Sequence, residues 1–395
     1  MSCAQAKRPP QGILFVLPWK VTAVGGVNQV VVNLIRQANR RGAFRPILLE
    51  IDWNSPRPTK VDGGEAPIIR FRLPSPTSSS APVRALVGFF GRLPSTLWHL
   101  RRILRANAIA AVNAHYPTQG ILSFWLLKAL GLYRGKLILS VHGLDIRNAL
   151  ASSGFERWLW RLLYRCADNI VACSNSLRLE VLEFEPRCGP RTVAIHNGVD
   201  WHAIESGRDN RFCLPELDGV PYVLSVGKFE HKKGQDLLLT AFARLAPEFP
   251  QLHLVLVGAS GPTLASLREQ AAALGVAERV HFHVDVPHRR IPAFFERATV
   301  FCLPSRAEPF GIVLLEAALY GVPVIAARVG GVVEIMRDGV HGCLVAPEDP
   351  TAFESALRRL LTDRELCQRF AAAFAEHVRT AFTWDKAFNQ YAELV

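Results

Sequence analysis

Short apolar runs alternate with longer amphipathic segments along nearly the whole chain. In the first half, the runs that predict strands lie at Gly12–Leu17, Pro46–Ile51, Ile68–Leu73, Ile109–Ala114, Lys136–Val141, Asn169–Ala172 and Thr192–Ile195. In the second half they lie at Pro221–Val226, Leu252–Val257, Val280–His283, Thr299–Leu303, Pro323–Ala326 and Gly342–Val345. These runs are apolar on both faces, and helical stretches such as Val27–Arg40 and Glu156–Cys166 fill the gaps. The alternation is typical of an α/β protein whose parallel sheets are covered by helices on both sides.

The apolar pattern is interrupted by a polar stretch at residues 201–219. We interpret this stretch as a linker between two doubly wound domains, because domain boundaries fall in polar segments with few contacts. The length supports this division, since 395 residues are too many for one comfortable core and fit two domains of about 200 residues each. Two such domains in tandem place a ligand cleft between them.

Composition and cysteine usage narrow the class of protein. A hydrophobic content of 49% with 20% charged residues is ordinary for a globular enzyme and excludes extensive disorder. The eight cysteines show neither a C-x-x-C pair nor a metal-ligand spacing, which favours a reducing compartment and free thiols. The sequence shows no signal peptide before the first strand and no run of 18 apolar residues, so we expect a cytoplasmic protein without a membrane-spanning segment.

The net charge of +12 is concentrated in the first half, above all in the basic and aromatic segment Arg84–Arg105. Its arginines and its cluster of Phe89, Phe90, Leu93 and Trp98 are typical of a helix that lies on an anionic membrane surface. The alternative is a helix whose apolar face packs on the sheet and whose basic face is only solvated. The sequence shows no nucleic-acid-binding module, so we expect no nucleic-acid partner.

Two glutamates, Glu308 and Glu316, lie eight residues apart around a glycine turn. An apolar strand precedes the turn and a helix follows it, which is the arrangement that binds nucleotides and phosphates in open α/β sheets. The backbone N–H groups of Gly311, Ile312 and Val313 would be free donors able to hold a diphosphate. An anion cradle between two carboxylates suits a nucleotide-sugar, which has phosphate in the middle and hydroxyls at both ends. The alternative is a loop charge and a solvated helix residue.

The segment that contains both glutamates, Pro304–Ala326, resembles the E-x7-E signature of the retaining family-4 glycosyltransferases, which have the GT-B fold. Further matches follow the family's order along the chain. They are Gly25-Gly26 after the first strand, Val141–Asp145 at the end of another strand, His196–Asp200, the phosphate loop Ser225–Gly234, Val329–Glu334 and Gly339–Val345. Seven matches in sequence over about 320 residues identify the chain as a member of this family.

The resemblance implies a fold and a domain organisation. A GT-B protein has two doubly wound, Rossmann-like domains that face each other across a cleft. Residues 1–200 are therefore expected to bind the acceptor, and residues 220–376 to bind the nucleotide-sugar. The C-terminal residues 377–395 resemble the family's last helix, which crosses back to the first domain.

The resemblance also implies an activity. We expect a retaining hexosyltransferase that moves a sugar from a UDP-, GDP- or ADP-linked donor to a lipid-linked glycan or polysaccharide acceptor. Such an enzyme would serve polysaccharide biosynthesis of the cell envelope, as a peripheral protein on the cytoplasmic face of the membrane. The sequence leaves the sugar, the nucleotide base, the acceptor, the linkage and the oligomeric state open.

Individual roles follow from the family's motifs. By resemblance, Glu308 bonds the hydroxyls of the transferred sugar, Glu316 bonds the ribose hydroxyls, and His142 contacts the sugar from the opposing domain. The remaining positions expected to bind the donor are Gly25, Gly26, Asn197 and Phe310. Each has a structural alternative, because a histidine at a strand end, or a Gly-Gly or Asn-Gly turn, can serve packing alone.

The chain contains no Asp-x-Asp motif, which holds the metal in glycosyltransferases of another fold. We therefore expect no cofactor and no metal, and fixed cations that stabilise the charge developing on the leaving diphosphate. Lys228 and Lys233 on the phosphate loop are the candidates, and Lys232 is the alternative for the second position. The family usually has arginine where Lys228 stands, so a point charge replaces bidentate phosphate contact there. The predicted catalytic residues are thus Glu308, His142 and Lys233.

Other functions could use the same features. A catalytically silent GT-B scaffold that binds a glycan or protein partner would be expected to lose Glu308, Lys233 or the Gly25-Gly26 loop, and all are present. A glycosidase could use two carboxylates, but the phosphate-type loops around them argue against hydrolysis. An epimerase would lack the context of the two-glutamate signature, and a phosphorylase normally carries a covalent cofactor lysine that the sequence does not identify.

Overall fold

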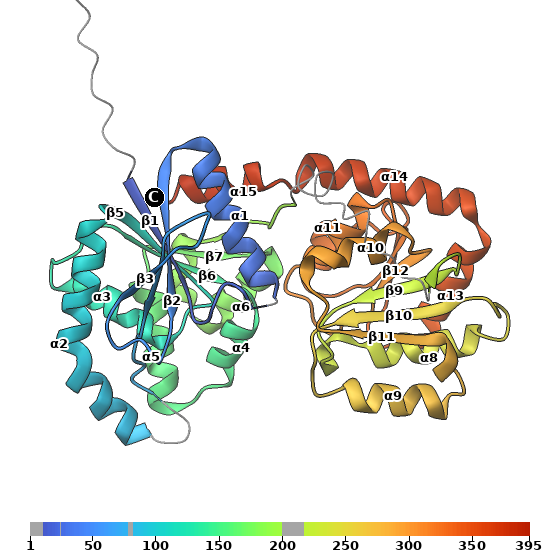
Figure 1. Ribbon diagram of the computed structural model, residues 1–395, viewed down its shortest axis with the longest axis horizontal. Coiled ribbons are helices and arrows are strands. Elements are labelled where there is room, and N and C mark those ends of the chain that lie inside the picture. Colours follow the sequence, from blue (N-terminus) through green and yellow to red (C-terminus); the bar gives the residue numbers. More distant parts are fainter. Residues whose placement is uncertain (1–10, 24, 78–81, 200–216) are drawn as a thin grey trace, which may run out of the picture. The chain divides into compact units, whose positions relative to one another are not determined.

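The computed structural model describes residues 11–23, 25–77, 82–199 and 217–395, and it divides into two compact units (Figure 1). The first unit contains the residues up to Ile195 together with Trp384–Val395, and the second contains His196–Thr383. Most of the linker expected at 201–219 lies outside the described residues. Each unit has a sheet of its own, so the two are described in turn.

The sheet of the first unit has eight strands in the order β3-β4-β2-β1-β5-β6-β7-β8, all parallel except β3. The strands are β1 (Gln11–Leu17), β2 (Phe44–Ile51), β3 (Thr59–Val61), β4 (Ile68–Phe71), β5 (Ile109–His115), β6 (Lys136–Val141), β7 (Asn169–Ala172) and β8 (Thr192–Ala194). Because β1 has β2 on one side and β5 on the other, the winding direction reverses between β1 and β5. Doubly wound proteins bind ligands at the carboxyl ends of the strands at such a switch point.

Helices surround this sheet (Figure 1). They are α1 (Gly26–Arg41), α2 (Pro82–Ala106), α3 (Leu122–Ala129), α4 (Leu144–Ala151), α5 (Gly154–Cys166), α6 (Asn175–Phe184) and α15 (Trp384–Ala392). Gly42 caps the C-terminus of α1, and its left-handed φ of 60° lets its N–H reach the carbonyls of Ala38 and Asn39. Helix α6 begins where the Ser174 hydroxyl accepts the N–H of Leu177 at 3.0 Å.

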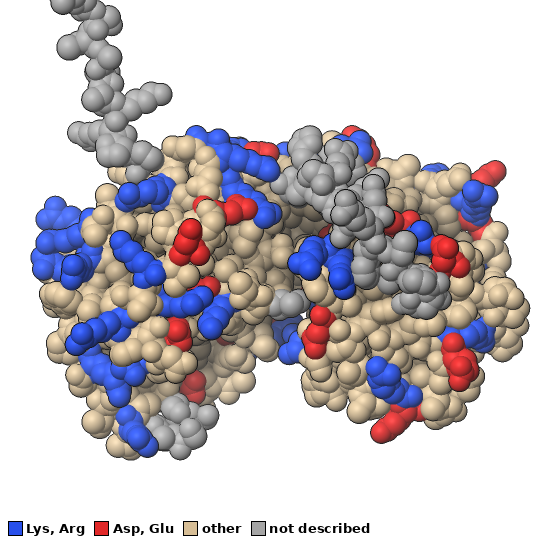
Figure 2. All heavy atoms as spheres, viewed as in Figure 1, with Lys and Arg blue, Asp and Glu red and all other residues tan. Residues whose placement is uncertain are grey.

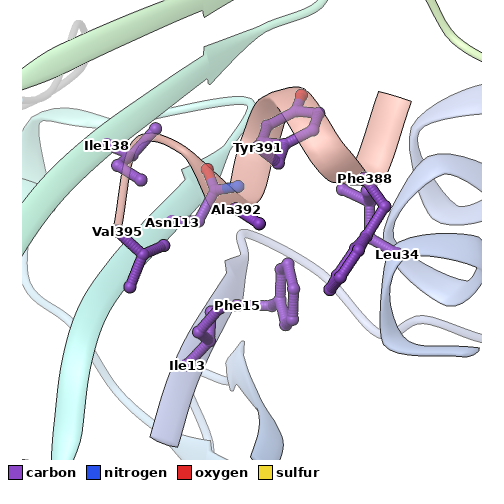
Figure 3. A pocket seen from close by; sticks show the side chains of 9 residues that line it. All are labelled: Ile13, Phe15, Leu34, Asn113, Ile138, Phe388, Tyr391, Ala392 and Val395. Atoms are coloured by element: carbon purple, nitrogen blue, oxygen red, sulfur yellow. The ribbon is translucent and has the colours of Figure 1, made fainter. Parts of the chain in front are cut away.

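The last helix, α15, belongs to the first unit although most of its neighbours there lie far away in the sequence. Arg41 at the end of α1 forms an ion pair with Asp385 at 2.7 Å, and Tyr391 Oη lies 3.4 Å from Ser140 Oγ on β6. A cavity of about 10 Å³ lies beneath this helix. Figure 3 shows the side chains that line it, which are those of Ile13, Phe15, Leu34, Asn113, Ile138, Phe388, Tyr391, Ala392 and Val395. A space of this size holds at most one water molecule, so α15 packs closely on the sheet.

The sheet of the second unit has six parallel strands in the order β11-β10-β9-β12-β13-β14. They are β9 (Tyr222–Val226), β10 (His253–Gly258), β11 (Val280–Val284), β12 (Val300–Leu303), β13 (Val324–Ala327) and β14 (Cys343–Val345). All residues of β12 and β13 are buried, as expected for central strands covered on both faces. The winding direction reverses between β9 and β12, which makes this the switch point of the second unit.

The helices of the second unit are α8 (Gln235–Leu245), α9 (Leu264–Ala273), α10 (Ile291–Glu296), α11 (Ile312–Leu319), α12 (Val332–Ile335), α13 (Pro350–Thr362) and α14 (Arg364–Ala381). Asp349 and Asp363 cap α13 and α14 by accepting backbone N–H groups of their first turns. Helix α14 ends at Ala381, and the following residue Phe382 accepts the N–H of Val199 at 3.0 Å. The next helix begins at Trp384.

The structure confirms the α/β class and the doubly wound sheets that the sequence predicts. Every predicted strand is present, with ends that differ by at most two residues. Strand β3 was not predicted, because it has three residues, of which two are exposed, and therefore no apolar run. Among the described residues, no helix combines the length and the apolar composition that a membrane span needs.

Candidate functional site

Two loops meet at the switch point of the second unit, where β9 and β12 are neighbours. One loop follows β9 at residues 227–234, and the other follows β12 at residues 304–311. The backbone N–H of Arg306 donates to the carbonyl of Lys232 at 2.8 Å. Its guanidinium also donates to both carboxylate oxygens of Asp236, at 2.8 and 2.7 Å. Bidentate pairs of this kind fix geometry as well as adding energy, so Arg306, which sequence reasoning missed, ties the two loops together.

Glycines let these loops approach more closely than side chains would permit. At Gly234, where φ is 66°, an added Cβ would lie 1.9 Å from the carbonyl oxygen of Pro304. At Gly330, where φ is 47°, an added Cβ would lie 2.1 Å from the carbonyl oxygen of Glu308. Glycine adopts such left-handed backbone without strain and leaves room for the neighbouring carbonyl. The loop at 304–311 is therefore clamped between glycines of two other loops.

Glu308 is buried against a lysine and a serine. Lys233 Nζ donates to Glu308 Oε2 at 2.7 Å, and Ser305 Oγ donates to the same oxygen at 3.1 Å. Glu308 is only 7% exposed, and an ion pair removed from water is stronger than one on the surface. The structure thus brings together two of the predicted catalytic residues within the second unit.

The other two lysines of the phosphate loop pair with Glu230 instead. Lys228 Nζ lies 2.5 Å from one carboxylate oxygen of Glu230, and Lys232 Nζ lies 2.9 Å from the other. Burial alone would raise the pKa of Glu230, but hydrogen bonds from the two lysines hold it below its ordinary value. Among the lysines of this loop, Lys233 is the one whose ammonium group reaches Glu308.

Helix α11 begins directly after these loops, with Gly311 as its N-cap. The φ of Gly311 is 105°, a left-handed value that disfavours any side chain. The N–H groups of Ile312 and Val313 open the first turn and have no acceptor within the helix. They carry the partial positive charge of a helix N-terminus, so they form an anion-binding end next to the Lys233–Glu308 pair.

Phe310 and Asn197 are both buried, with exposed fractions of 3% and 5%. The ring of Phe310 lies 5.6 Å from that of His196 and 6.0 Å from that of Phe382. His196 Nε2 in turn lies 2.8 Å from a carboxylate oxygen of Glu334. The buried side chain of Phe310 is used in this packing, so a role of Phe310 in donor binding would rest on its backbone atoms.

Glu316, the fifth residue of α11, has a neighbour that sequence reasoning missed. His288 Nε2 lies 3.4 Å from Glu316 Oε1. The hydrogen bond to Glu316 raises the pKa of His288, although burial opposes the shift. His288 lies in a 3₁₀ turn, His288–Arg290, and no motif in the sequence links this turn to α11.

In the first unit, His142 follows β6 at the carboxyl edge of the sheet. The Asp145 carboxylate accepts the N–H of His142 at 2.9 Å, of Gly143 at 2.8 Å and of Ile146 at 2.9 Å. These bonds fix the turn that carries His142 into α4. Burial raises the pKa of Asp145 to about 6, although the backbone N–H groups favour its charged form.

A second histidine, which sequence reasoning missed, backs His142. His115 Nδ1 lies 3.1 Å from His142 Nε2, and the two rings stack with centroids 5.4 Å apart. Burial lowers the pKa of His142 to about 4. Burial and the charge of His142 also lower the pKa of His115. Both rings are therefore neutral near pH 7, and one donates the hydrogen bond that the other accepts. A signal existed, because His115 ends the strand next to β6 at the same edge of the sheet.

Gly25 and Gly26 stand at the switch point of the first unit, where Gly25 is the N-cap of α1 and Gly26 is the first residue of that helix. Gly25 has a φ of 166°, an extended conformation that any residue adopts. A Cβ added there would meet nothing within 4 Å. Neither conformation nor packing within the unit requires glycine at this position, and the open space lies at a helix N-terminus, where anions bind.

Two family descriptions match most of the chain. Glycosyltransferase Family 4 matches residues 24–202, and Glycosyl transferases group 1 matches residues 208–377. The first match contains Gly25, His142 and Asn197, and the second contains Lys233, Glu308 and Glu316.

Relatives with similar sequences carry the names of sugar transferases. D-inositol 3-phosphate glycosyltransferase of Streptomyces griseus is 39% identical over 258 residues, which cover 59% of this chain and 54% of the relative. GDP-mannose-dependent alpha-(1-6)-phosphatidylinositol monomannoside mannosyltransferase of Mycolicibacterium smegmatis is 31% identical over 272 residues, which cover 66% of this chain and 70% of the relative. The chain spans about half of the length of the first of these relatives.

Solved structures resemble the chain over almost its whole length. Sucrose-phosphate synthase of Thermosynechococcus elongatus has a TM-score of 0.76 at 23% identity, covering 97% of this chain and 98% of that protein. HepE of Anabaena, whose structure contains UDP and glucose, has a TM-score of 0.72 at 20% identity, with coverage of 97% and 98%. At these identities the likeness shows a shared fold.

Proposed function

The chain belongs to the family-4 glycosyltransferases and has the GT-B fold, and from this premise we propose that it moves a sugar from a nucleoside diphosphate sugar to a lipid-linked glycan or polysaccharide acceptor. We propose further that transfer retains the anomeric configuration and uses no metal. The observation that carries the proposal is the Lys233–Glu308 pair beside the N-terminus of α11.

The pair suits a donor that brings its own negative charge. When the diphosphate enters, Lys233 can exchange the Glu308 carboxylate, now 2.7 Å away, for phosphate oxygens. The N–H groups of Ile312 and Val313 supply further donors. Glu308 is then free to accept hydrogen bonds from the sugar hydroxyls, and Glu316 from the ribose hydroxyls.

The proposed reaction breaks the bond between the anomeric carbon and the diphosphate oxygen while the acceptor oxygen bonds to the same face of that carbon. The acceptor proton passes to the departing phosphate oxygen, so no protein base is needed. Negative charge grows on the diphosphate as the bond breaks, and Lys233 together with the α11 N–H groups stabilises that charge more in the transition state than in the ground state.

His142 has the properties of a neutral hydrogen-bonding group toward the sugar. Its pKa of about 4 keeps it uncharged at neutral pH, and the contact with His115 couples the tautomers of the two rings. We propose that His142 positions the sugar and that His115 positions His142.

The acceptor side of the proposal draws on the names of the relatives. One is named for an inositol phosphate acceptor and the other for a phosphatidylinositol mannoside. Both acceptors combine a polyol with a phosphoryl group, and the second is a lipid. A lipid acceptor would require access to a membrane surface.

Helix α2 offers a surface suited to such access. It contains arginines and no acidic residue, and Figure 2 shows basic side chains along the edge of the first unit that carries it. Of the four hydrophobic residues in the expected cluster, Phe90 and Trp98 are exposed at 61% and 55%, whereas Phe89 is buried and Leu93 is half-buried. We therefore propose that Phe90 and Trp98, joined by the exposed Val83 and Val87, form the membrane-facing stripe.

A thermal-shift screen with UDP-, GDP- and ADP-sugars in EDTA tests the donor proposal, because a ligand that binds the folded state raises its stability. We expect one nucleotide series to raise the Tm. The matching donor, incubated with phosphorylated inositol and lipid-linked acceptors, should give a product whose anomeric configuration by NMR equals that of the donor. The absence of any nucleotide-dependent shift, or an inverted product, would overturn the proposal.

A further inference from the structure

A second candidate site lies between the β2–β3 loop and the C-terminal half of α2, beside β4 rather than at the switch point between β1 and β5. This cavity is open to solvent, has a volume of about 510 Å³ and is lined by Arg57, Ser95, Trp98, His99 and Arg102, of which all but His99 are exposed. The four residues on α2 follow the spacing i, i+3, i+4 and i+7, so they share one face of the helix. Arg57 reaches the cavity from the loop before β3.

The lining consists of hydrogen-bond donors and no carboxylate. Among the described residues, no Asp or Glu lies within 4.0 Å of the guanidinium of Arg57 or Arg102, whereas many arginines elsewhere in the chain are paired. The Arg102 guanidinium lies 5.7 Å from the centroid of the Trp98 ring, a cation–π contact that holds it at the wall of the cavity. Two unpaired guanidiniums with a neighbouring hydroxyl match the oxygens of a phosphoryl group.

The pKa of His99 depends on the positive charge that surrounds it in this cavity. Its ring makes edge contacts with the rings of Trp98 and Phe71, whose centroids lie 4.7 and 5.5 Å away. Burial lowers the pKa of His99, and the charges of Arg57 and Arg102 lower it further. A bound anion would counter the charge of the two arginines and raise the pKa of His99.

We propose that this cavity binds a phosphoryl group and thereby forms an anion site separate from the donor site of the second unit. The volume exceeds that of a phosphate ion and admits the polyol attached to it. The same chemistry is present in the headgroup of an anionic lipid and in a soluble phosphorylated acceptor.

The surroundings of the cavity favour the lipid headgroup. Trp98 lines the cavity and also belongs to the exposed stripe with Val83, Val87 and Phe90. A headgroup held by Arg57 and Arg102 would leave its acyl chains beside that stripe. The assignment to a lipid rests on the proposed function, whereas phosphoryl binding itself depends only on the cavity.

Titration of sn-glycerol 3-phosphate at constant ionic strength, followed by NMR of the His99 ring, tests the proposal. His99→Gln identifies the signal, and Lys233→Ala shows that the readout is independent of the donor site. We expect a saturable shift and a raised pKa of His99 in wild type and in Lys233→Ala. Arg57→Ala and Arg102→Ala should weaken binding about tenfold or more, because each removes a charge-assisted hydrogen bond.

Arg84→Ala is the matched control. Arg84 is also exposed and on α2, but it lies 18 residues from Arg102, or about 27 Å along the helix, and its loss should leave the binding constant unchanged. The proposal is overturned if the His99 signal does not respond, or if Arg57→Ala and Arg102→Ala bind as tightly as Arg84→Ala.

Vesicles of phosphatidylcholine with and without phosphatidate distinguish the two sources. A lipid headgroup is indicated if Arg57→Ala and Arg102→Ala pellet less with phosphatidate vesicles than Arg84→Ala does. Equal pelleting of all three variants, combined with weakened glycerol phosphate binding, supports the phosphoryl site and assigns it to a soluble phosphorylated acceptor.

Discussion

The buried Glu308 pairs with the partly buried Lys233, and this contact bears on what a neutral replacement would do. In Glu308→Gln the amide keeps the size but loses the charge that would orient the sugar hydroxyls. We expect kcat to fall about 100-fold, or about 3 kcal/mol in the transition state. The affinity for the nucleoside diphosphate should hold or rise, because Lys233 no longer has to leave a carboxylate. Steady-state kinetics measures kcat, and a titration with the nucleotide measures the affinity. An unaltered kcat would show that Glu308 has no catalytic role.

The histidine pair of the first unit predicts a pH-dependent stability. The pKa of His142 is about 4 and that of His115 is also lowered, whereas an unfolded histidine titrates near about 6.5. As the pH falls, these histidines therefore bind protons in the unfolded chain before they do so in the folded protein. Above about pH 7 the two histidines are neutral in both states and do not lower the free energy of unfolding. As the pH falls from 6.5 toward 4, protonation of the unfolded chain should lower the free energy of unfolding.

Denaturant unfolding of wild type and of the double variant His115→Phe, His142→Phe at pH 7.5, 6 and 5 measures this effect. The comparison separates the effect of the histidines from that of Asp145. Because the pKa of Asp145 is raised to about 6, its protonation makes the folded protein more stable as the pH falls through the same range. The double variant should lose less stability than wild type on acidification. Parallel declines would show that the histidines titrate normally in the folded state.

At the level of single residues, sequence reasoning found the groups that belong to motifs and missed their partners. Lys233 and Glu308 were both predicted, but not that they pair, because their contact spans 75 positions. The same limit applies to Arg306, His115 and His288, whose roles depend on contacts between loops. Burial and mutual distance, which decide these roles, do not appear in a local pattern.

At the level of elements, the glycines around the 304–311 loop set how closely it can pack. Gly330→Ala would place a Cβ 2.1 Å from the carbonyl of Glu308, so the loop must shift. We expect a loss of about 1–2 kcal/mol from the left-handed backbone alone, a further loss from the clash, and a fall in kcat of about tenfold or more from displaced Glu308.

Gly275→Ala provides the control for this prediction. Gly275 has a similar φ of 71°, but a Cβ added there meets nothing within 4 Å. It should lose stability by the backbone term and keep full activity. If both variants keep wild-type kcat, close packing against Gly330 is not needed to place Glu308.

Helix α2 gives an element-scale test of membrane contact, because neighbouring phenylalanines have opposite environments. Phe90 is exposed whereas Phe89 is buried. Phe90→Ser should reduce pelleting with anionic vesicles and leave the Tm unchanged. Phe89→Ser should lower the Tm through a lost core contact. Equal pelleting of wild type and Phe90→Ser on anionic vesicles would mean that the stripe does not meet lipid.

The elements themselves were largely predictable, and the exceptions have physical reasons. Buried parallel strands appear in the sequence as continuous apolar runs, so the predicted strand ends lie within two residues of the ends in the structure. Strand β3 is short and exposed, and it forms only through its pairing with β4. For α2, the sequence identified the basic aromatic helix but not which of its aromatic side chains the sheet covers.

At the scale of the whole molecule, the same winding occurs twice, and in each unit the predicted residues gather at the strand ends near the switch point. The second unit supplies cations and helix N–H groups for an anion, and the first supplies a neutral histidine pair and an open glycine turn. This division of chemistry follows from topology, since parallel strands deliver their loops to one edge. The sequence could predict where these motifs gather because they follow strands in both halves, but it did not predict that His115 pairs with His142.

The central claim is that Lys233 and the start of α11 bind a nucleoside diphosphate without metal. Calorimetric titration of UDP or GDP, whichever the screen selects, into wild type, Lys233→Ala and Lys232→Ala in EDTA tests it directly. We predict binding at one site per chain in wild type, an affinity about tenfold or more weaker in Lys233→Ala, and a nearly unchanged affinity in Lys232→Ala, whose lysine pairs with Glu230. Binding that requires Mg²⁺ or Mn²⁺, or equal affinities for all three proteins, would contradict the account.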